Sequence, residues 1–200
     1  QWALLIRFAV FQGDKWRPID NGKDFQNKTF GASETIHTTS SAFGAHIARG
    51  FRKARGRKLQ NNWRLQGASR DMWKAYRQVP ISEDSQRFSV IAVWDVEHRA
   101  WRFCICYVLL FGLSAAVAQF NRLPALLVAA ARRILALPVS AFFDDFRLLD
   151  PCIAKDSGWQ MFSRLADFVG FKFDPRKDVK PSPKLKLLGN LEDYSLTSSK

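Results

Sequence analysis

Two adjacent acidic residues, Asp144 and Asp145, lie within an otherwise apolar stretch that covers residues 135–149. Burying an unpaired carboxylate costs several kcal/mol or forces it to hold a proton. No Lys or Arg precedes Arg147 in this stretch, so the compensating charge has to be a metal ion or a basic side chain from a distant segment. Carboxylate oxygens suit Mg2+ and Mn2+. The fold must therefore bring a cation to this pair.

The acidic pair also predicts a turn. Successive side chains of a regular strand point to opposite faces, so both carboxylates reach one ion only if the chain turns there. We expect a hairpin with strands over residues 139–143 and 146–149 and both aspartates at its tip. Because Asp is common in turns, an ordinary hairpin is the alternative interpretation. A metal site would also need a third carboxylate from elsewhere in the chain.

The charge of the chain indicates the kind of partner. Its 200 residues include 31 Lys and Arg against 18 Asp and Glu, a formal net charge of +13. Such an excess favours a polyanion, with nucleic acid first and an anionic membrane second. No apolar stretch reaches the length of about 18 residues that suggests a transmembrane helix, and no secretory signal is evident. We expect an intracellular protein, cytoplasmic or nuclear, without a membrane partner.

One segment concentrates the basic residues. Between Arg49 and Arg64 there are seven Lys and Arg and no acidic residue. The simplest interpretation is a solvated helix face and loop. The alternatives are a phosphate-contacting patch or a localisation signal. The overall charge favours contact with nucleic acid.

The pattern of apolar residues and turn signals gives an order of elements. Residues 14–30 have the composition of a loop or a bent ribbon, and Pro124 should bend or divide a long helix. The segments expected to be helical are residues 42–55, a short segment after Asp71 that stops at Pro80, 115–137 and 157–169. The expected strands are residues 88–94, 101–110, the hairpin strands and 171–173, followed by a basic loop and residues 186–191. This order indicates an α+β fold, an antiparallel sheet with helices on one face.

Five motifs occur in a fixed order along the chain. They are Asp71-x-x-x-Ala75-Tyr76-x-Gln78-Val79, then Phe111-Gly112-Leu113-Ser114 with Gln119-Phe120, then Phe142-Phe143-Asp144-Asp145, then Gly170 to Lys177, and Leu187-Leu188-Gly189. Each is weak alone, but together they resemble the palm and part of the fingers of a reverse transcriptase, an RNA-directed DNA polymerase of retroelements. The resemblance implies partial fingers over residues 1–66, a palm over 67–189 with a fingers insertion at about 80–105, and the start of a thumb or a linker over 190–200.

The resemblance implies a reaction and its catalytic residues. Asp71 supplies the third carboxylate, and Asp71, Asp144 and Asp145 are expected to hold two Mg2+ or Mn2+ ions, with Asp145 the weaker or supporting ligand. Two such ions clamp the attacking 3' oxygen and the leaving oxygen of an in-line displacement. The expected partners are an RNA or DNA template with its primer, deoxynucleoside triphosphates, and possibly other domains of a longer polyprotein.

Further residues receive binding roles from the same resemblance. Tyr76 is expected to close the sugar pocket against a ribose 2'-hydroxyl, with core packing as the alternative. Lys15 and Arg17 are expected to grip the triphosphate, with a surface basic pair as the alternative. The remaining nucleotide-binding candidates are Gln78, Phe111, Gly112 and Lys177. The primer or template candidates are Gln119, Leu188, Gly189, Arg52 and Arg55.

The chain departs from the family pattern in two motifs. Residues 67–70, Gly-Ala-Ser-Arg, stand where an apolar strand is usual, so we expect Arg70 to pair with Asp71 and compete with metal. Leu110 replaces the usual proline of the second motif. The rival interpretation is a catalytically decayed module of the same fold that binds nucleic acid only. An RNA-copying polymerase is a more distant rival, against which Tyr76 argues.

Overall fold

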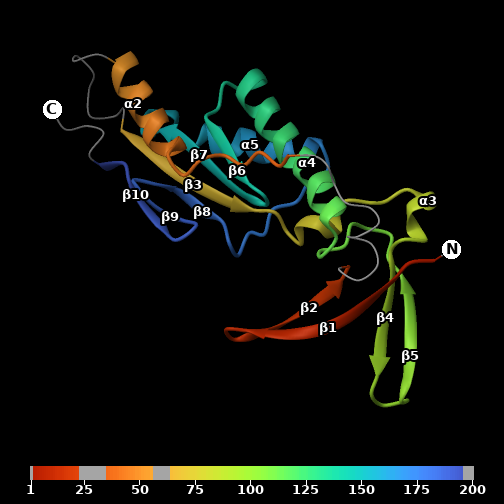
Figure 1. Cartoon of the computed structure of the whole chain (residues 1–200). Helices are drawn as coiled ribbons and strands as arrows, with labels where there is room; N and C mark the ends of the chain where they lie inside the picture. The colour runs from red at the N-terminus through yellow and green to blue at the C-terminus, as the bar shows by residue number, and fades with distance from the viewer. Residues whose placement is uncertain (1, 23–34, 56–63, 196–200) are drawn as a thin grey trace. The chain divides into compact units, whose positions relative to one another are not determined.

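The computed structural model describes residues 2–22, 35–55 and 64–195 and shows a mixed α+β fold (Figure 1). The chain divides into two compact units, each built from two segments. Unit 1 comprises Gln1–Ile36 and Lys74–Arg122, and unit 2 comprises His37–Trp73 and Leu123–Lys200. None of the helices among the described residues has both the length and the apolar character needed to cross a membrane.

Unit 1 is built on a four-stranded sheet in the order β2-β1-β4-β5. The strands are β1 (Leu4–Gln12), β2 (Lys15–Asn21), β4 (Val90–Asp95) and β5 (Ala100–Ile105). β1 and β4 are parallel, and the other neighbours are antiparallel. A two-residue turn joins β1 to β2, and Gly13 supplies the positive φ of +65° that such a tight turn requires. One face of the sheet packs on a core of Leu5, Ile91 and Leu110.

Three helical elements accompany this sheet along the chain. Two are short, η2 (Ala75–Gln78) and α3 (Glu83–Gln86), and the third is the long helix α4 (Ser114–Ile134). α4 begins in unit 1 and ends in unit 2. We expected Pro124 to bend or divide the long helix. It lies inside α4 and does not divide it.

Unit 2 contains a four-stranded antiparallel sheet in the order β6-β7-β3-β8 and a separate hairpin. The sheet strands are β3 (Leu65–Asp71), β6 (Val139–Phe142), β7 (Asp145–Pro151) and β8 (Val179–Ser182), and the hairpin strands are β9 (Lys184–Leu187) and β10 (Asn190–Asp193). The helices of this unit other than α4 are α2 (Phe43–Arg55), η3 (Cys152–Ala154) and α5 (Ser157–Phe168).

The two faces of the unit 2 sheet are covered by different elements. On one face Phe146 of β7 contacts Phe162 of α5 and Phe173. On the other face Leu65 and Leu149 form a buried cluster with the β9–β10 hairpin, and α2 packs against this cluster. Helices α2 and α5 therefore lie on opposite faces, so the expectation of helices on one face only is wrong for this sheet (Figure 1).

Several expected elements are confirmed and others are wrong. The helices over 42–55 and 157–169 and the hairpin around the aspartates are present within one or two residues. Residues 15–21 are a strand where a loop or bent ribbon was expected, and residues 179–182 are a strand where a basic loop was expected. Residues 171–173 are reduced to a single bridge between Met72 and Phe173. Propensity misses these short strands because pairing with a neighbour, and not local composition, stabilises them.

Candidate active site

The strand register of unit 2 brings the three predicted carboxylates together. β3 and β7 are antiparallel and place Asp71, the last residue of β3, directly opposite Asp145, the first residue of β7. Directly opposite residues of such a pair have Cβ atoms about 5 Å apart on one face of the sheet. The backbone N–H of Met72 donates to the carbonyl oxygen of Asp144 at 3.0 Å, which ties the turn to the end of β3. The expected proximity is present, and the catalytic roles remain a prediction.

The turn differs in detail from the expected one. Only Phe143 and Asp144 form it, because Asp145 already pairs with Phe142 as the first residue of β7. The expectation that both aspartates sit at the tip is therefore wrong for Asp145. Phe143 has a φ of +53°, a left-handed conformation that is costly for a residue with a Cβ. The chain reverses direction at Phe143 and Asp144, so Asp144 lies in the turn and Asp145 begins β7.

The electrostatic surroundings of the trio are unfavourable for negative charge. Burial, followed by the nearby Asp144 and Asp71, raises the pKa of Asp145 to about 6. Burial is also the main cause that raises the pKa of Asp144, with a smaller contribution from Asp71. Like charges placed opposite each other on a sheet are destabilising. The site therefore favours any cation that can approach it.

Lys177 is the cation that contacts the trio. Its Nζ atom lies 2.7 Å from Oδ1 of Asp71, and this hydrogen bond is the main cause that raises the pKa of Lys177. The turn that carries it is fixed to β3, because the backbone N–H of Asp174 donates to the carbonyl oxygen of Asp71 at 2.9 Å. The Arg176 guanidinium donates two hydrogen bonds to the Asp174 carboxylate. Lys177 thus lies at the carboxylates, and its predicted contact with a triphosphate remains a prediction.

Arg70 does not compete for the catalytic carboxylates. Neighbouring residues of a strand point to opposite faces, and Arg70 points to the α5 side. Its guanidinium lies 3.8 Å from the centre of the Trp159 ring and forms an ion pair of 3.6 Å with Asp178. The expected pairing of Arg70 with Asp71 is therefore wrong. Stacking of the Arg70 guanidinium on the Trp159 ring stabilises this polar residue at the end of β3.

The donor atoms suit a divalent ion, although the side chains are not arranged around one. Three carboxylates on the ends of adjacent strands offer the oxygen ligands that Mg2+ and Mn2+ take. Burial, with a smaller contribution from the neighbouring carboxylates, raises the pKa values of Asp144 and Asp145. Among residues 2–22, 35–55 and 64–195, no group of three or more His, Cys, Asp or Glu is positioned to share a metal ion. Asp71, Asp144 and Asp145 are the residues that would hold one.

A pocket of about 510 Å3 adjoins Asp145. Its wall is rich in hydroxyl groups from residues 38–41 and Ser140, and its opposite side is the β9–β10 hairpin with Leu188 and Asn190. The positive φ values of Leu188 and Gly189 form the tight turn of that hairpin. Leu188, predicted to contact the primer, therefore lines the same pocket as a predicted catalytic carboxylate.

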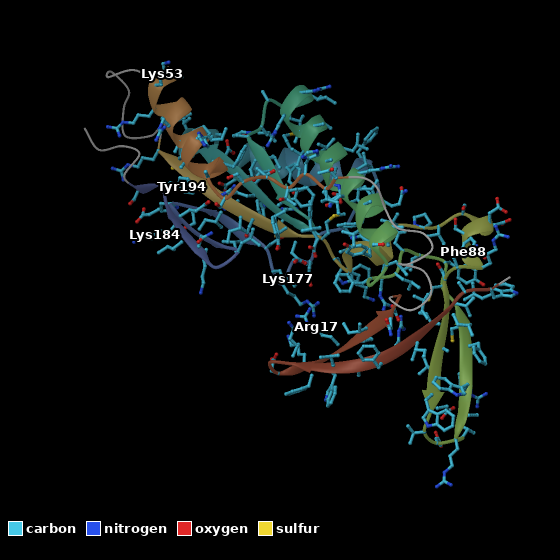
Figure 2. The ribbon with its side chains drawn as sticks, viewed as in Figure 1. Arg17, Lys53, Phe88, Lys177, Lys184 and Tyr194 are labelled. Atoms are coloured by element: carbon cyan, nitrogen blue, oxygen red, sulfur yellow. The ribbon has the colours of Figure 1, made fainter. Side chains whose placement is uncertain are left out.

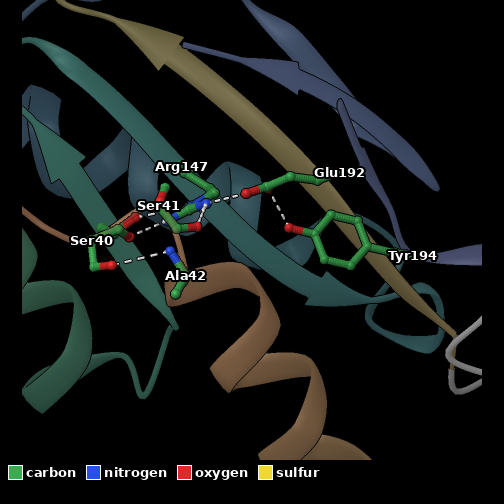
Figure 3. Close-up of polar contacts among 7 residues, drawn as sticks. Ser40, Ser41, Ala42, Arg147, Glu192 and Tyr194 are labelled. Atoms are coloured by element: carbon green, nitrogen blue, oxygen red, sulfur yellow. Dashed lines mark hydrogen bonds and ion pairs between the residues drawn. The ribbon is translucent and has the colours of Figure 1, made fainter. Parts of the chain in front are cut away.

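A largely buried polar network that lines part of this pocket was missed from the sequence (Figure 3). Arg147 forms an ion pair with Glu192 of β10 and donates to the carbonyl oxygens of Ser40 and Ser41 and to Oγ of Ser140. The Tyr194 hydroxyl donates to the other oxygen of Glu192. The network connects β7, the segment before α2 and the β9–β10 hairpin. The signal in the sequence was an arginine two residues after Asp145 in an apolar strand.

Tyr76 and the second motif lie in unit 1. The Tyr76 ring stacks on Phe120 with 4.3 Å between ring centres and meets the edge of Phe111 at 5.4 Å. Gly112 has a φ of +119°, and a Cβ there would lie 2.1 Å from the carbonyl oxygen of Asp20, so only glycine fits. The largely buried Tyr76 ring agrees with the core-packing alternative, and its sugar-pocket role remains a prediction.

The other predicted binding residues are placed on four elements. Lys15 and Arg17 are on β2, Gln78 ends η2, and Gln119 lies in α4, where its side-chain oxygen accepts from Arg122. Arg52 and Lys53 are both exposed on α2, and Figure 2 labels Lys53. The Arg55 side chain and residues 56–63 of the basic run lie outside the described residues. Their roles in binding remain predictions.

Comparisons with known proteins give structural neighbours only. No family model matches the sequence, and no curated protein matches it. A foamy viral protease-reverse transcriptase dRH in complex with double-stranded DNA matches with a TM-score of 0.67 and 17% identity, over 98% of this chain and 31% of that chain. A foamy viral protease-reverse transcriptase in complex with double-stranded DNA matches with a TM-score of 0.67 and 16% identity, over 94% of this chain and 34% of that chain.

These neighbours define the class of fold. The protein has a reverse-transcriptase-like fold, and it spans about a third of the length of the two chains that it matches. At this identity the similarity concerns the fold alone.

Proposed function

We propose that the protein is an RNA-directed DNA polymerase that adds deoxynucleotides to a primer 3' end by phosphoryl transfer. The observation that supports this most is the register that sets Asp71 opposite Asp145, with Asp144 in the adjoining turn. Under this proposal the carboxylates of unit 2 belong to the palm, and the expected palm bounds of residues 67–189 remain a prediction. The reverse-transcriptase-like fold supports the class of reaction, since both structural neighbours are reverse transcriptases in complex with DNA.

The carboxylates have the chemistry that the reaction needs. Divalent ions, when bound, activate the attacking oxygen and neutralise charge on the leaving one. Asp71 and Asp144 would hold them, and Asp145 would support them from the first position of β7. The burial of Asp144 and Asp145 beside another carboxylate disfavours their ionised forms, and a bound cation would relieve this cost. Lys177, which contacts Asp71, would transfer this contact to a phosphate oxygen of the triphosphate.

The pocket beside Asp145 fits the end of a primer. Its hydroxyl-rich wall offers donors and acceptors for a sugar, and the hairpin with Leu188 and Gly189 offers an apolar and backbone surface on the other side. The exposed basic residues of α2, including Arg52 and Lys53, would attract the phosphates of a template or primer strand.

A binding module without catalysis is the second candidate. Two observations favour it: the Lys177 ammonium group contacts Asp71, and no three acidic or metal-ligating side chains among the described residues converge on a point. In that case Lys177 would be a permanent counterion, and the trio would be a relic of a polymerase.

Primer extension separates the two candidates. Extension of a DNA primer on an RNA template with Mg2+ or Mn2+ should fall at least about a hundredfold in Asp144→Asn, because a ligand for the charge that develops in the transition state is lost. Template binding should stay close to that of the unaltered protein. Asp84→Asn, the same change at an exposed position of α3, is the matched control. Equal extension by Asp144→Asn and the control would refute the proposed reaction.

A further inference from the structure

The β9–β10 hairpin is attached to the rest of unit 2 mainly through its side chains. Among the described strands, β9 and β10 pair only with each other, whereas β8, which precedes the hairpin, belongs to the four-stranded sheet. No shared ladder of strand hydrogen bonds therefore sets the distance between the hairpin and the carboxylates. The side chains on the inward face of the hairpin have to set it.

Two residues of this inward face differ in the kind of contact that they make. Leu185 of β9 is fully buried against Leu65 and Leu149. Glu192 of β10 stands directly opposite Leu185, so it points to the same face, and its side chain is only 16% exposed. The burial of Leu185 has no preferred direction and tolerates sliding. A largely buried carboxylate has to meet its partners at defined distances and angles.

Arg147 is the oppositely charged partner of Glu192 (Figure 3). The same guanidinium donates to the carbonyl oxygens of Ser40 and Ser41 at 3.3 Å each, and to Oγ of Ser140 at 3.2 Å. The segment before α2, strand β6 and the hairpin therefore meet at one planar group whose donors are fixed relative to each other. A movement of the hairpin would break this geometry.

Tyr194 fixes the second oxygen of Glu192. Its hydroxyl donates to Oε2 of Glu192, and its ring lies between Gly44 of α2 and Gly67 of β3. A Cβ at Gly44 would lie 2.6 Å from the hydroxyl oxygen, and a Cβ at Gly67 would lie 2.7 Å from a ring carbon of Tyr194. Burial, followed by the hydrogen bond to Glu192, raises the pKa of Tyr194 well above its ordinary value. The hydroxyl therefore keeps the proton that it donates.

This network and the candidate active site share one pocket. Arg147 lies two residues after Asp145 on β7, so both side chains point to the same face of the sheet. Both line the pocket, together with Glu192 and with Leu188 from the turn of the hairpin. A shift of Glu192 relative to Arg147 would change the separation of Leu188 and Asp145 across the pocket.

We propose that Arg147, Glu192 and Tyr194 are positioning residues, which hold the hairpin at a set distance from Asp145 and thereby place the 3' end of a primer at the carboxylates. This inference rests on the proposed function, because it concerns the same primer. The alternative is that the network only stabilises the fold. The two differ in what they require, since positioning needs the directional contacts, whereas stability needs only that no buried charge is left unmatched.

A double variant separates position from stability. Arg147→Met/Glu192→Met removes both charges, so it leaves no uncompensated buried charge and keeps the net charge of the chain, but it loses the directional contacts. Lys184→Met/Asp193→Met is the matched control, because these two side chains form an ion pair of 3.6 Å on the outward face of the same hairpin. Urea unfolding measures the stability of both double variants.

Photo-cross-linking measures the placement of the primer without turnover. A primer–template with a photoreactive thio-substituted thymine at the primer 3' end is irradiated in complex with the full chain, and the cross-linked residues are mapped by mass spectrometry. We expect cross-links within residues 184–193 in the unaltered protein and in the control. In Arg147→Met/Glu192→Met their yield should fall at least about fivefold. The affinity for the primer–template should stay within about threefold, because phosphate contacts elsewhere supply most of it.

Extension kinetics give a second readout. Under single-turnover conditions, nucleotide addition by Arg147→Met/Glu192→Met should slow at least about tenfold, because a misplacement of about 1 Å can cost on the order of a hundredfold in rate. A role in stability alone predicts that the rate returns together with the stability. Tyr194→Phe keeps the ring and the ion pair and is the milder variant should the double variant fail to fold. Its cross-link yield should fall at least about twofold.

Three results would overturn the proposal. They are full cross-link yield at residues 184–193 in a folded double variant, unchanged yield in Tyr194→Phe, and an unaltered protein that binds the primer without cross-linking there. A protein that cross-links as expected but extends no primer would support the positioning role and refute the polymerase reaction. The two proposals can therefore fail independently.

Discussion

Asp145 and Arg147 are two residues apart on β7, and their side chains point to the same face of the sheet. Their electrostatic surroundings differ. Asp145 faces another carboxylate, Asp71, across the β3–β7 pair. Arg147, buried in the same strand, has a carboxylate partner in Glu192 and further acceptors on two other segments. The fold therefore gives Arg147 an oppositely charged partner, whereas the neighbours of Asp145 include two further carboxylates. Under the proposed function, the unmatched charge of Asp145 serves a ligand, and the matched charge of Arg147 serves the structure.

The largest expected effect is on the matched charge. Arg147→Met should lower the free energy of unfolding by about 3–5 kcal/mol, because Glu192 would be left as an uncompensated buried charge. Arg147→Met/Glu192→Met should recover much of this loss, since replacing both partners removes that charge. Urea unfolding measures both, with the exposed Arg133→Met as the control. A double variant no more stable than the single one would show that packing, and not charge, explains the loss.

The next effect concerns the unmatched charge and its pH dependence. The pKa of Asp145 is raised to about 6 from an ordinary value of 3.8. Between these values the folded protein holds a proton that the unfolded chain releases, so stability falls as pH rises through this window and stays lower above it. Without divalent ions, Asp145→Asn should stabilise the protein at pH 7.5 by about 1–2 kcal/mol, allowing for screening at this half-exposed site.

The same variant should show no gain near pH 3.5, because Asp145 is then neutral in the folded protein. Thermal unfolding at both pH values measures the difference. Mn2+ should stabilise the unaltered protein at pH 7.5 more than it stabilises the variant. A gain that is equal at both pH values would mean that Asp145 is not held under electrostatic stress.

The smallest expected effect is on Lys177, the lysine that contacts Asp71. The Lys177 side chain is 58% exposed, so its ion pair with Asp71 is weak. Lys177→Met should raise the affinity for Mn2+ up to about fivefold by removing a competing positive charge. Titration followed by electron paramagnetic resonance measures this without any turnover, and Lys180→Met on β8 is the control. Weaker Mn2+ binding by Lys177→Met would show that the lysine helps to organise the carboxylates.

The sequence predicted the carboxylate site better than its surroundings. Asp71, Asp144 and Asp145 are identified by local motifs, and the antiparallel pairing of β3 with β7 brings them together. Arg147 and Glu192 lie 45 residues apart, and nothing local to either residue specifies the other. Arg70 was assigned to Asp71 because the two are adjacent in sequence, but strand alternation separates adjacent side chains.

The strands of unit 1 show a second limit. β1 is an almost continuous apolar run, so its period does not reveal which face is buried. Only the pairing with β2 and β4 shows that Leu5 enters the core and that Phe8 is exposed. The positions of Lys15 and Arg17 on the same face of the sheet as Phe8 follow from the same pairing and could not be derived from their motif.

The left-handed Phe143 has a consequence for motion near the carboxylates. Glycine at this position would relieve a conformational cost of about 1 kcal/mol and would also give the turn many more accessible backbone states. Phenylalanine at this position therefore lowers the stability of the turn and also restricts its backbone motion. The backbone of Asp144, the next residue, is restricted as well. A stiff turn restricts the Asp144 carboxylate to a narrow range of orientations, so less conformational entropy would be lost when it binds a cation.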